Sequence, residues 1–182
     1  MATVYDFNLK DKKGNEVSLG TYKGKVLLIV NTATGCGFTP QYEDLEAMYH
    51  SLKDKGLEIL DIPCDQFGHQ APGTDEEIRE FCTMKFGAGF PQFKKSEVNG
   101  ANELPLYTWL KSEKGYAGGG YEAKLAAVME DLYSKANTEP RKQNDIQWNF
   151  TKFLVNRNGE VVARFEPTVD LKEVRKAVEA EL

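Results

Sequence analysis

One of the three cysteines in this 182-residue chain, Cys36, lies between two glycines in the stretch NTATGCGFTPQY, residues 31–42. An apolar run over residues 25–30 precedes this stretch, and a helix start follows it at Thr39-Pro40. A thiol on such a strand-to-helix turn lies beside free backbone N–H groups, which stabilise the nucleophilic thiolate. The alternative is a small buried hydrophobic residue, as many single cysteines are. The position favours a reactive thiol without deciding the question.

The other two cysteines can be explained by packing. Cys64 ends an apolar run, and Cys82 lies on a predicted helix stripe with Ile78 and Phe81. A second thiol on a helix could still meet an oxidised Cys36 if that helix frayed. The cysteines form no Cys-x-x-Cys pair, and neither histidine has ligand-like spacing to them. The sequence therefore predicts no metal site and disfavours a general disulfide oxidoreductase.

Composition and charge restrict the class of protein. The net charge of −5 disfavours nucleic acid and anionic membranes as partners, because both require a basic face. The first residues have neither a basic region nor an apolar region of a signal peptide, and the longest apolar run, residues 26–30, is too short to span a bilayer. An odd number of cysteines without a secretion signal indicates reduced thiols. A cytoplasmic protein is the expectation.

Strand and helix patterns alternate around these residues, as an α/β fold requires. The patterns predict strands over residues 4–9, 16–19, 25–32, 57–64, 90–98, 149–155 and 161–165, and helices over 40–55, 75–84, 105–110, 125–132 and 170–182. Thr74 and Glu77 form a capping box at the start of one of these helices. The order predicts an α/β sandwich with a mixed sheet.

Three stretches together resemble one family, the glutathione peroxidases in their cysteine-containing form. They are NTATGCGFTPQY (31–42), PCDQFGHQAPG (63–73) and WNFTKFLV (148–155). A weaker similarity extends over nearly the whole chain. The resemblance implies a thioredoxin-like fold, with a central mixed sheet flanked by helices and an N-terminal β-hairpin. It also implies that residues 1–182 form a single domain.

The resemblance implies roles for four residues and requires no cofactor. Cys36 would be the peroxidatic residue, and Gln70, Trp148 and Asn149 would surround it. Their amide and indole N–H groups can hydrogen-bond the thiolate and the departing peroxide oxygen. The product is a sulfenic acid, which thiols must reduce. Without the resemblance, Trp148 would be interpreted as a core residue and Gln70 as an ordinary loop residue.

The resemblance also implies a role for Cys82. Family members that use thioredoxin have a resolving cysteine on the helix after the glutamine loop, and the segment EFCTMKF resembles that helix. Cys82 would attack the Cys36 sulfenic acid and form a disulfide that thioredoxin reduces. The step requires local unfolding of the 75–84 helix, which two glycines just beyond it favour. Cys64 is interpreted as structural.

The chain departs from the family pattern at several positions. Asp65 stands where members usually have asparagine, Ala71 where they usually have glutamate, and Thr34-Gly35 replaces serine and a bulkier residue. A carboxylate at Asp65 would disfavour the thiolate if it lay close. Residues 114–145 are longer than in compact members, and tetrameric members carry an insertion about here. A monomer and a homo-oligomer therefore both remain possible.

The leading hypothesis is a peroxidase that reduces hydrogen peroxide and organic hydroperoxides with thiol electrons. Thioredoxin is the expected donor because Cys82 is present, and glutathione is the alternative. A peroxide sensor that relays a disulfide to a partner protein would use the same Cys36–Cys82 pair. A non-catalytic binding module of the same fold would have no chemical need for the four-residue set around Cys36.

Overall fold

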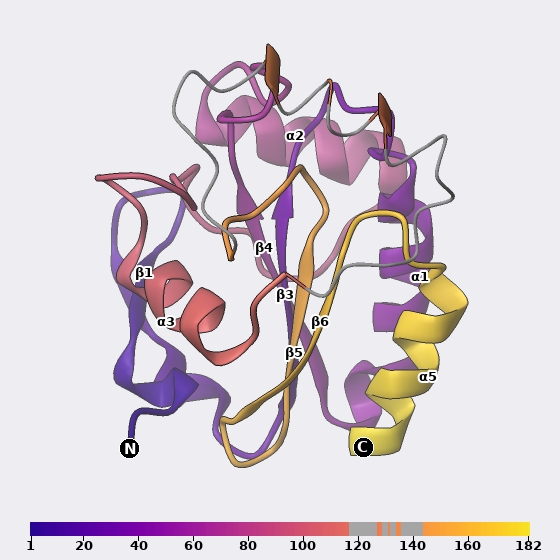
Figure 1. The fold of residues 1–182 in the computed structure, drawn as a ribbon. Coiled ribbons are helices and arrows are strands. Elements are labelled where there is room, and N and C mark those ends of the chain that lie inside the picture. Colours follow the sequence, from indigo (N-terminus) through magenta and orange to yellow (C-terminus); the bar gives the residue numbers. More distant parts are fainter. Residues whose placement is uncertain (117–126, 129–130, 132–133, 136–143) are drawn as a thin grey trace.

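A computed structural model describes residues 1–116, 127–128, 131, 134–135 and 144–182. In this part of the chain a four-stranded sheet forms the centre (Figure 1). Its strands lie in the order β4 (Leu57–Pro63), β3 (Val26–Thr32), β5 (Lys152–Val155) and β6 (Val161–Phe165). β3 pairs with β4 in parallel and with β5 in antiparallel, so the sheet is mixed as predicted.

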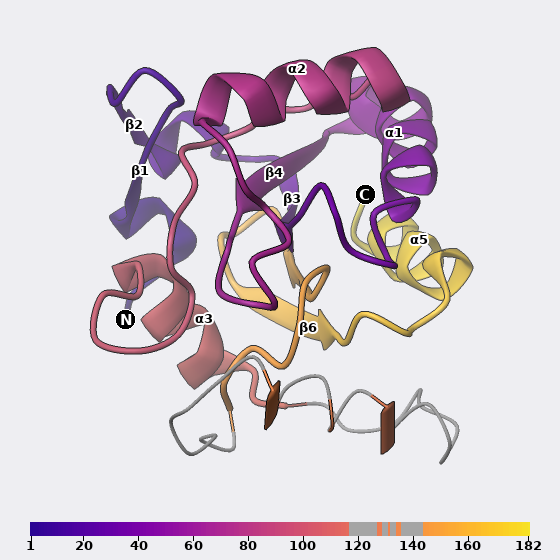
Figure 2. The same ribbon diagram turned by 90° about the horizontal axis from the view of Figure 1, so that it is seen from above.

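Helices cover both faces of this sheet. They are α1 (Gln41–Leu52), α2 (Asp75–Phe86), α3 (Pro105–Glu113) and α5 (Leu171–Glu181). α1 and α5 lie on one side, whereas α3 and the hairpin of β1 (Asn8–Lys10) and β2 (Glu16–Ser18) lie on the other (Figures 1 and 2). α2 crosses the top of the molecule next to the end of β4 and reaches α1 (Figure 2).

The central strands are buried on both faces, which explains their nearly continuous apolar runs. Every residue of β3 and β5 is buried, and so is every residue of β4 except Glu58. Two ionisable residues nevertheless lie fully buried within these strands, Asp61 on β4 and Lys152 on β5. Burial of a charge is costly unless it is compensated, so both positions require local partners.

Thr74 caps α2, because its Oγ1 accepts from the Glu77 N–H at 3.1 Å. The predicted capping box is only half formed, because the Glu77 carboxylate accepts from the Thr74 hydroxyl group at 3.2 Å in place of its backbone N–H. The expected N-terminal hairpin is also present, although Val4–Asp6 forms a short 3-10 turn before β1. The helix predicted over residues 125–132 lies mainly outside the described residues. That a single domain spans the chain stays a prediction.

Several predicted boundaries differ from the structure, and three of them have a clear local cause. The helix predicted from Pro40 begins at Gln41, and Thr39 does not cap it because its hydroxyl group is used inside the preceding turn. The strand predicted over 149–155 begins at Lys152, because Phe150 has a left-handed φ of 67° that no extended strand permits.

The third wrong boundary concerns residues 90–98, which form isolated bridges in place of the predicted strand. Gln92 pairs with Asp61 and Phe93 pairs with Asp11. Pro91 interrupts any longer ladder, because it has no N–H group to donate.

Candidate active site

Cys36 lies in the turn between β3 and α1, at the edge where β3 and β4 end. The turn is held by Thr39, whose Oγ1 accepts from the Cys36 N–H at 3.0 Å and donates to the Ala33 carbonyl at 2.8 Å. The Phe38 N–H donates to Cys36 Sγ at 3.3 Å, and the residue is only 7% exposed. A backbone donor aimed at the sulfur stabilises a thiolate there.

The sheet topology brings the other predicted residues to the same edge. β5 runs antiparallel to β3, with Lys152 opposite Val30, so the segment just before β5 lies where β3 ends. That segment contains Trp148 and Asn149, and the loop after β4 contains Gln70. Residues far apart in sequence therefore meet beside the Cys36 turn.

Gln70 is joined to the Cys36 turn through its backbone. The N–H groups of Gly35 and Thr34 both donate to the Gln70 carbonyl, at 2.7 and 3.1 Å. A Cβ atom at position 35 would lie 3.3 Å from the same oxygen. Gly35, which departs from the family pattern, therefore permits the Cys36 turn and the loop that contains Gln70 to approach this closely.

The side chains of Gln70 and Asn149 meet directly, because Asn149 Nδ2 donates to Gln70 Oε1 at 3.1 Å. Asn149 is fully buried, whereas Gln70 is partly exposed. Within the described residues, no hydrogen bond joins Cys36 Sγ to Gln70, Trp148 or Asn149. In this form the two amides bind each other, and Gln70 Nε2 has no protein partner there.

Trp148 is nearly buried, and its ring packs against Phe67 with a centroid separation of 5.6 Å. Asn31, at the end of β3, fixes this segment. Asn31 Nδ2 donates to the Trp148 carbonyl at 3.1 Å, and the Asn31 carbonyl accepts from the Phe150 N–H at 2.6 Å. Sequence analysis missed this role of Asn31, although a polar residue after an apolar strand run was its signal.

Asp65 faces its own loop. Its carboxylate accepts from the Ala71 N–H at 3.0 Å and lies 3.2 Å from His69 Nδ1. These contacts close the 65–71 loop, which includes a left-handed His69 with φ of 50°. Asp65 therefore closes this loop through its side-chain oxygens, as the asparagine usual at this position in the family could also do.

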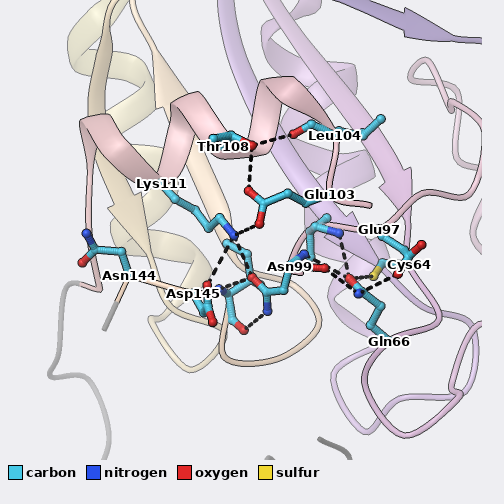
Figure 3. Close-up of polar contacts among 12 residues, drawn as sticks. Cys64, Gln66, Glu97, Asn99, Glu103, Leu104, Thr108, Lys111, Asn144 and Asp145 are labelled. Carbon is cyan, nitrogen blue, oxygen red and sulfur yellow. Dashed lines mark hydrogen bonds and ion pairs between the residues drawn. The ribbon is translucent and has the colours of Figure 1, made fainter. Parts of the chain in front are cut away.

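A second group of polar contacts ties the two loops that contain the predicted site residues (Figure 3). Asn99 binds both backbone groups of Ile146, with Nδ2 to the carbonyl at 2.8 Å and Oδ1 from the N–H at 3.0 Å. Gln66 Nε2 donates to the Asn99 carbonyl at 2.8 Å. Asn99 therefore links the loop that leads to Gln70 with the segment that leads to Trp148.

Lys111 on α3 completes this network (Figure 3). Its buried Nζ donates to Asn99 Oδ1 at 3.0 Å and lies 2.9 Å from Glu103 Oε1 and 3.4 Å from Asp145 Oδ1. The carboxylates compensate the buried ammonium group. The charged group thus anchors residues 145–146, just ahead of Trp148.

Cys64 and Cys82 occupy different buried environments. Burial raises the pKa of Cys64 to about 12, and its Sγ lies 3.5 Å from Gln66 Oε1. Burial, aided by the negative charge of Asp61, raises the pKa of Cys82 to about 11. Cys82 lies on the packed face of α2, as predicted. Both cysteines are free, as is Cys36.

The described residues contain no group of three or more histidine, cysteine or acidic side chains that could hold a metal ion. None of the helices in the described ranges is long and apolar enough to cross a membrane.

A thiol on a strand-to-helix turn of a thioredoxin-like sheet, beside paired amides, defines the class of thioredoxin-fold thiol oxidoreductases. Residues 4–111 match the family model for glutathione peroxidase. The chain therefore belongs to the glutathione peroxidase family, a family of peroxidase oxidoreductases.

Individual relatives agree with this assignment. A glutathione peroxidase homolog of Neisseria meningitidis is 52% identical over 97% of this chain and 98% of its own length. The glutathione peroxidase-like peroxiredoxin 2 of Saccharomyces cerevisiae is 46% identical over 90% and 86% of the two chains. The crystal structure of Trgpx in apo form has a TM-score of 0.72 and 33% identity, covering 99% of this chain and 95% of that one.

Proposed function

We propose that this protein reduces hydrogen peroxide and organic hydroperoxides through Cys36, with Cys82 as the resolving thiol and thioredoxin as the electron donor. The observation that carries the proposal is the Cys36 turn, in which a backbone N–H points at the sulfur and Gln70 is bound through its carbonyl. The donor groups of Gln70 and Asn149 lie beside that turn.

In the first step the Cys36 thiolate attacks one oxygen of the peroxide. A sulfur–oxygen bond forms, the oxygen–oxygen bond breaks, and the leaving oxygen takes a proton and departs as water or an alcohol. We assign Gln70 Nε2, which has no protein partner among the described residues, as the donor to the oxygen on which negative charge develops. The sulfur is oxidised to a sulfenic acid.

In the second step Cys82 attacks the Cys36 sulfenic acid. The sulfur–sulfur bond forms, the sulfur–oxygen bond breaks, and the hydroxyl group leaves as water with the proton of the Cys82 thiol. Because Cys82 is fully buried, α2 must open for this attack. Gly87, in a left-handed conformation, ends α2, and Met84 is 86% exposed. Phe86 stacks on Tyr42 with a centroid separation of 5.4 Å, so this contact must break when the end of the helix opens.

The disulfide is then reduced by a dithiol protein, and this returns both cysteines to the free form. The peroxiredoxin name of the yeast relative supports thioredoxin over glutathione as that donor. A cytoplasmic location stays a prediction, supported by the three free thiols.

The test is peroxide turnover by wild type, Cys36→Ser, Cys82→Ser and Cys64→Ser. Each is assayed with the thioredoxin system and, separately, with glutathione and glutathione reductase. We expect Cys36→Ser to be inactive with both donors, and Cys82→Ser to lose turnover with thioredoxin only. Cys64→Ser, which changes a second buried thiol, is the matched control and should turn over normally. Wild-type turnover with glutathione alone would reject the thioredoxin assignment.

A further inference from the structure

A buried polar cluster lies between α2 and β4, and its centre is Asp61. The Asp61 side chain is fully buried, and three neutral groups donate to its two oxygens. They are Thr32 Oγ1, Tyr42 Oη at 2.8 Å and Gln92 Nε2 at 2.8 Å. Full burial raises the pKa of Asp61, and the three donors oppose this effect without cancelling it.

Cys82 shares one of these donors. Gln92 Nε2 also lies 3.6 Å from Cys82 Sγ, so a single amide nitrogen joins the Asp61 carboxylate to the thiol. Arg79, on the same helix, donates from Nη1 to the Phe90 carbonyl at 3.0 Å, and its charge favours an ionised Asp61. The reaction described above uses neither Asp61 nor Gln92.

Asp61 and Gln92 are also held by backbone contacts that do not involve α2. The Asp61 N–H donates to the Pro91 carbonyl at 3.0 Å, and the Asp61 carbonyl accepts from the Phe93 N–H at 2.9 Å. Gln92 lies between these two contacts, opposite Asp61. These backbone contacts of Asp61 can remain when α2 opens, whereas the contacts of α2 to Phe90 and Lys95 are lost.

We propose that Asp61 and Gln92 form a cradle that holds the Cys82 thiol against the sheet, so that release from this cradle sets how fast Cys82 reaches the Cys36 sulfenic acid. Both are positioning residues, because they act on Cys82 and not on the peroxide. The inference rests on the proposed role of Cys82 as the resolving thiol.

The surroundings of Cys82 in the cradle keep its thiol unreactive while α2 is closed. The carboxylate and the buried site both disfavour a thiolate, so Cys82 stays protonated and unreactive while α2 is closed. Once α2 opens, the thiol leaves the carboxylate and regains its ordinary acidity in water. A tighter cradle prolongs the life of the Cys36 sulfenic acid, which excess peroxide oxidises further to a sulfinic acid.

The first measurement is the rate at which iodoacetamide labels Cys82 and Cys64 in a Cys36→Ser background, followed by mass spectrometry. We expect Gln92→Met and Asp61→Asn to speed Cys82 labelling about tenfold, with the rate at Cys64 unchanged. Gln66→Met is the control, because each glutamine binds one buried thiol: Gln66 Oε1 accepts from Cys64 Sγ, and Gln92 Nε2 donates to Cys82 Sγ. It should speed labelling of Cys64 only. Unchanged Cys82 labelling in Gln92→Met, or equal gains at both thiols, would overturn the cradle.

The second measurement uses Cys36 intact and follows its sulfinic acid after a pulse of excess hydrogen peroxide. Gln92→Met should lower the sulfinic fraction several-fold, because Cys82 then reaches the sulfenic acid before a second peroxide does. Faster Cys82 labelling without a lower sulfinic fraction would overturn the rate-setting role. Labelling in the Cys36→Ser background does not depend on turnover. If Cys82 is not the resolving thiol, the Cys82→Ser protein should instead turn over peroxide normally with thioredoxin.

Discussion

The ammonium group of Lys152 is fully buried on β5, where Nζ donates to Gln41 Oε1 at 2.5 Å. Burial lowers the pKa of Lys152 to about 7, against the opposing effect of Glu166. The unfolded chain binds this proton up to an ordinary lysine pKa near ~10.5. Between these two values the unfolded state holds more protons than the folded state, so stability rises with pH.

We therefore expect Lys152→Met to gain stability relative to wild type as the pH falls from 10 to 7, by about 1.4 kcal/mol per pH unit. The gain should level off below pH 7, where Lys152 is protonated in both states of the wild type. Urea unfolding of both proteins across this pH range measures the difference. Lys176→Met, on the exposed face of α5, should give a difference that does not vary with pH. A flat difference for Lys152→Met would mean that the buried amine is charged throughout.

Gln70 is the residue at which the chemistry of the peroxide step can be isolated. Truncation in Gln70→Ala removes the Nε2 donor and should lower the rate constant for Cys36 oxidation by hydrogen peroxide about 100-fold. Stopped-flow tryptophan fluorescence or competition with a reference peroxidase measures that rate. Alkylation of Cys36 by iodoacetamide, which expels no oxygen, should change far less. His69→Asn, one residue away on the same loop, is the control and should react as wild type does.

At the scale of elements, α3 and the loops it anchors form a unit around Lys111. Lys111→Met removes the buried ammonium group that lies between Glu103 and Asp145. The loss should destabilise the fold by about 2 kcal/mol, because partly buried carboxylates lose their counter-charge. The amide of Ile146, held by Asn99, should then exchange its hydrogen faster. Lys114→Met, on an exposed lysine at the end of the same helix, should leave both quantities unchanged.

The elements also show what local patterns can and cannot predict. The Thr74–Glu77 pair located the start of α2, because both partners lie within four residues of each other. Thr39 satisfied the same kind of rule, but its hydroxyl group is used by Ala33 and Cys36, so α1 begins later. A local rule fails when a contact formed by the folded loop competes for the same atom.

The residues of the candidate site likewise divide into those that local sequence patterns predict and those that they do not. The turn around Cys36 could be predicted from its own residues, because glycines and a following helix start are local signals. Gln70, Trp148 and Asn149 required the family resemblance, since only the pairing of β5 with β3 brings them to that edge. The burial of Asp61 and Lys152 could not be predicted, because each sits in an apolar run that gives no sign of its distant partners.

At the scale of the whole molecule, the proposed mechanism requires α2 to move while the sheet stays in place. β3 is paired along its length with β4 and β5, and Arg157 joins three distant segments through the carbonyls of Gly24, Lys55 and Leu182. None of these contacts involves α2. Under the proposed mechanism, we therefore expect a disulfide between Cys36 and Cys82 to form without disturbing the sheet.

The oxidised protein should reveal which part moves. After one equivalent of hydrogen peroxide, amide hydrogen exchange in residues 75–86 should rise by at least tenfold, because Cys82 can no longer occupy its buried site. Amides of β3 should stay protected, and the Cys82→Ser protein should show no such change after the same treatment. If residues 33–40 lost protection while 75–86 kept it, the Cys36 turn would be the mobile partner. The cradle would then hold Cys82 through the whole cycle, and resolution would depend on how Thr39 releases that turn.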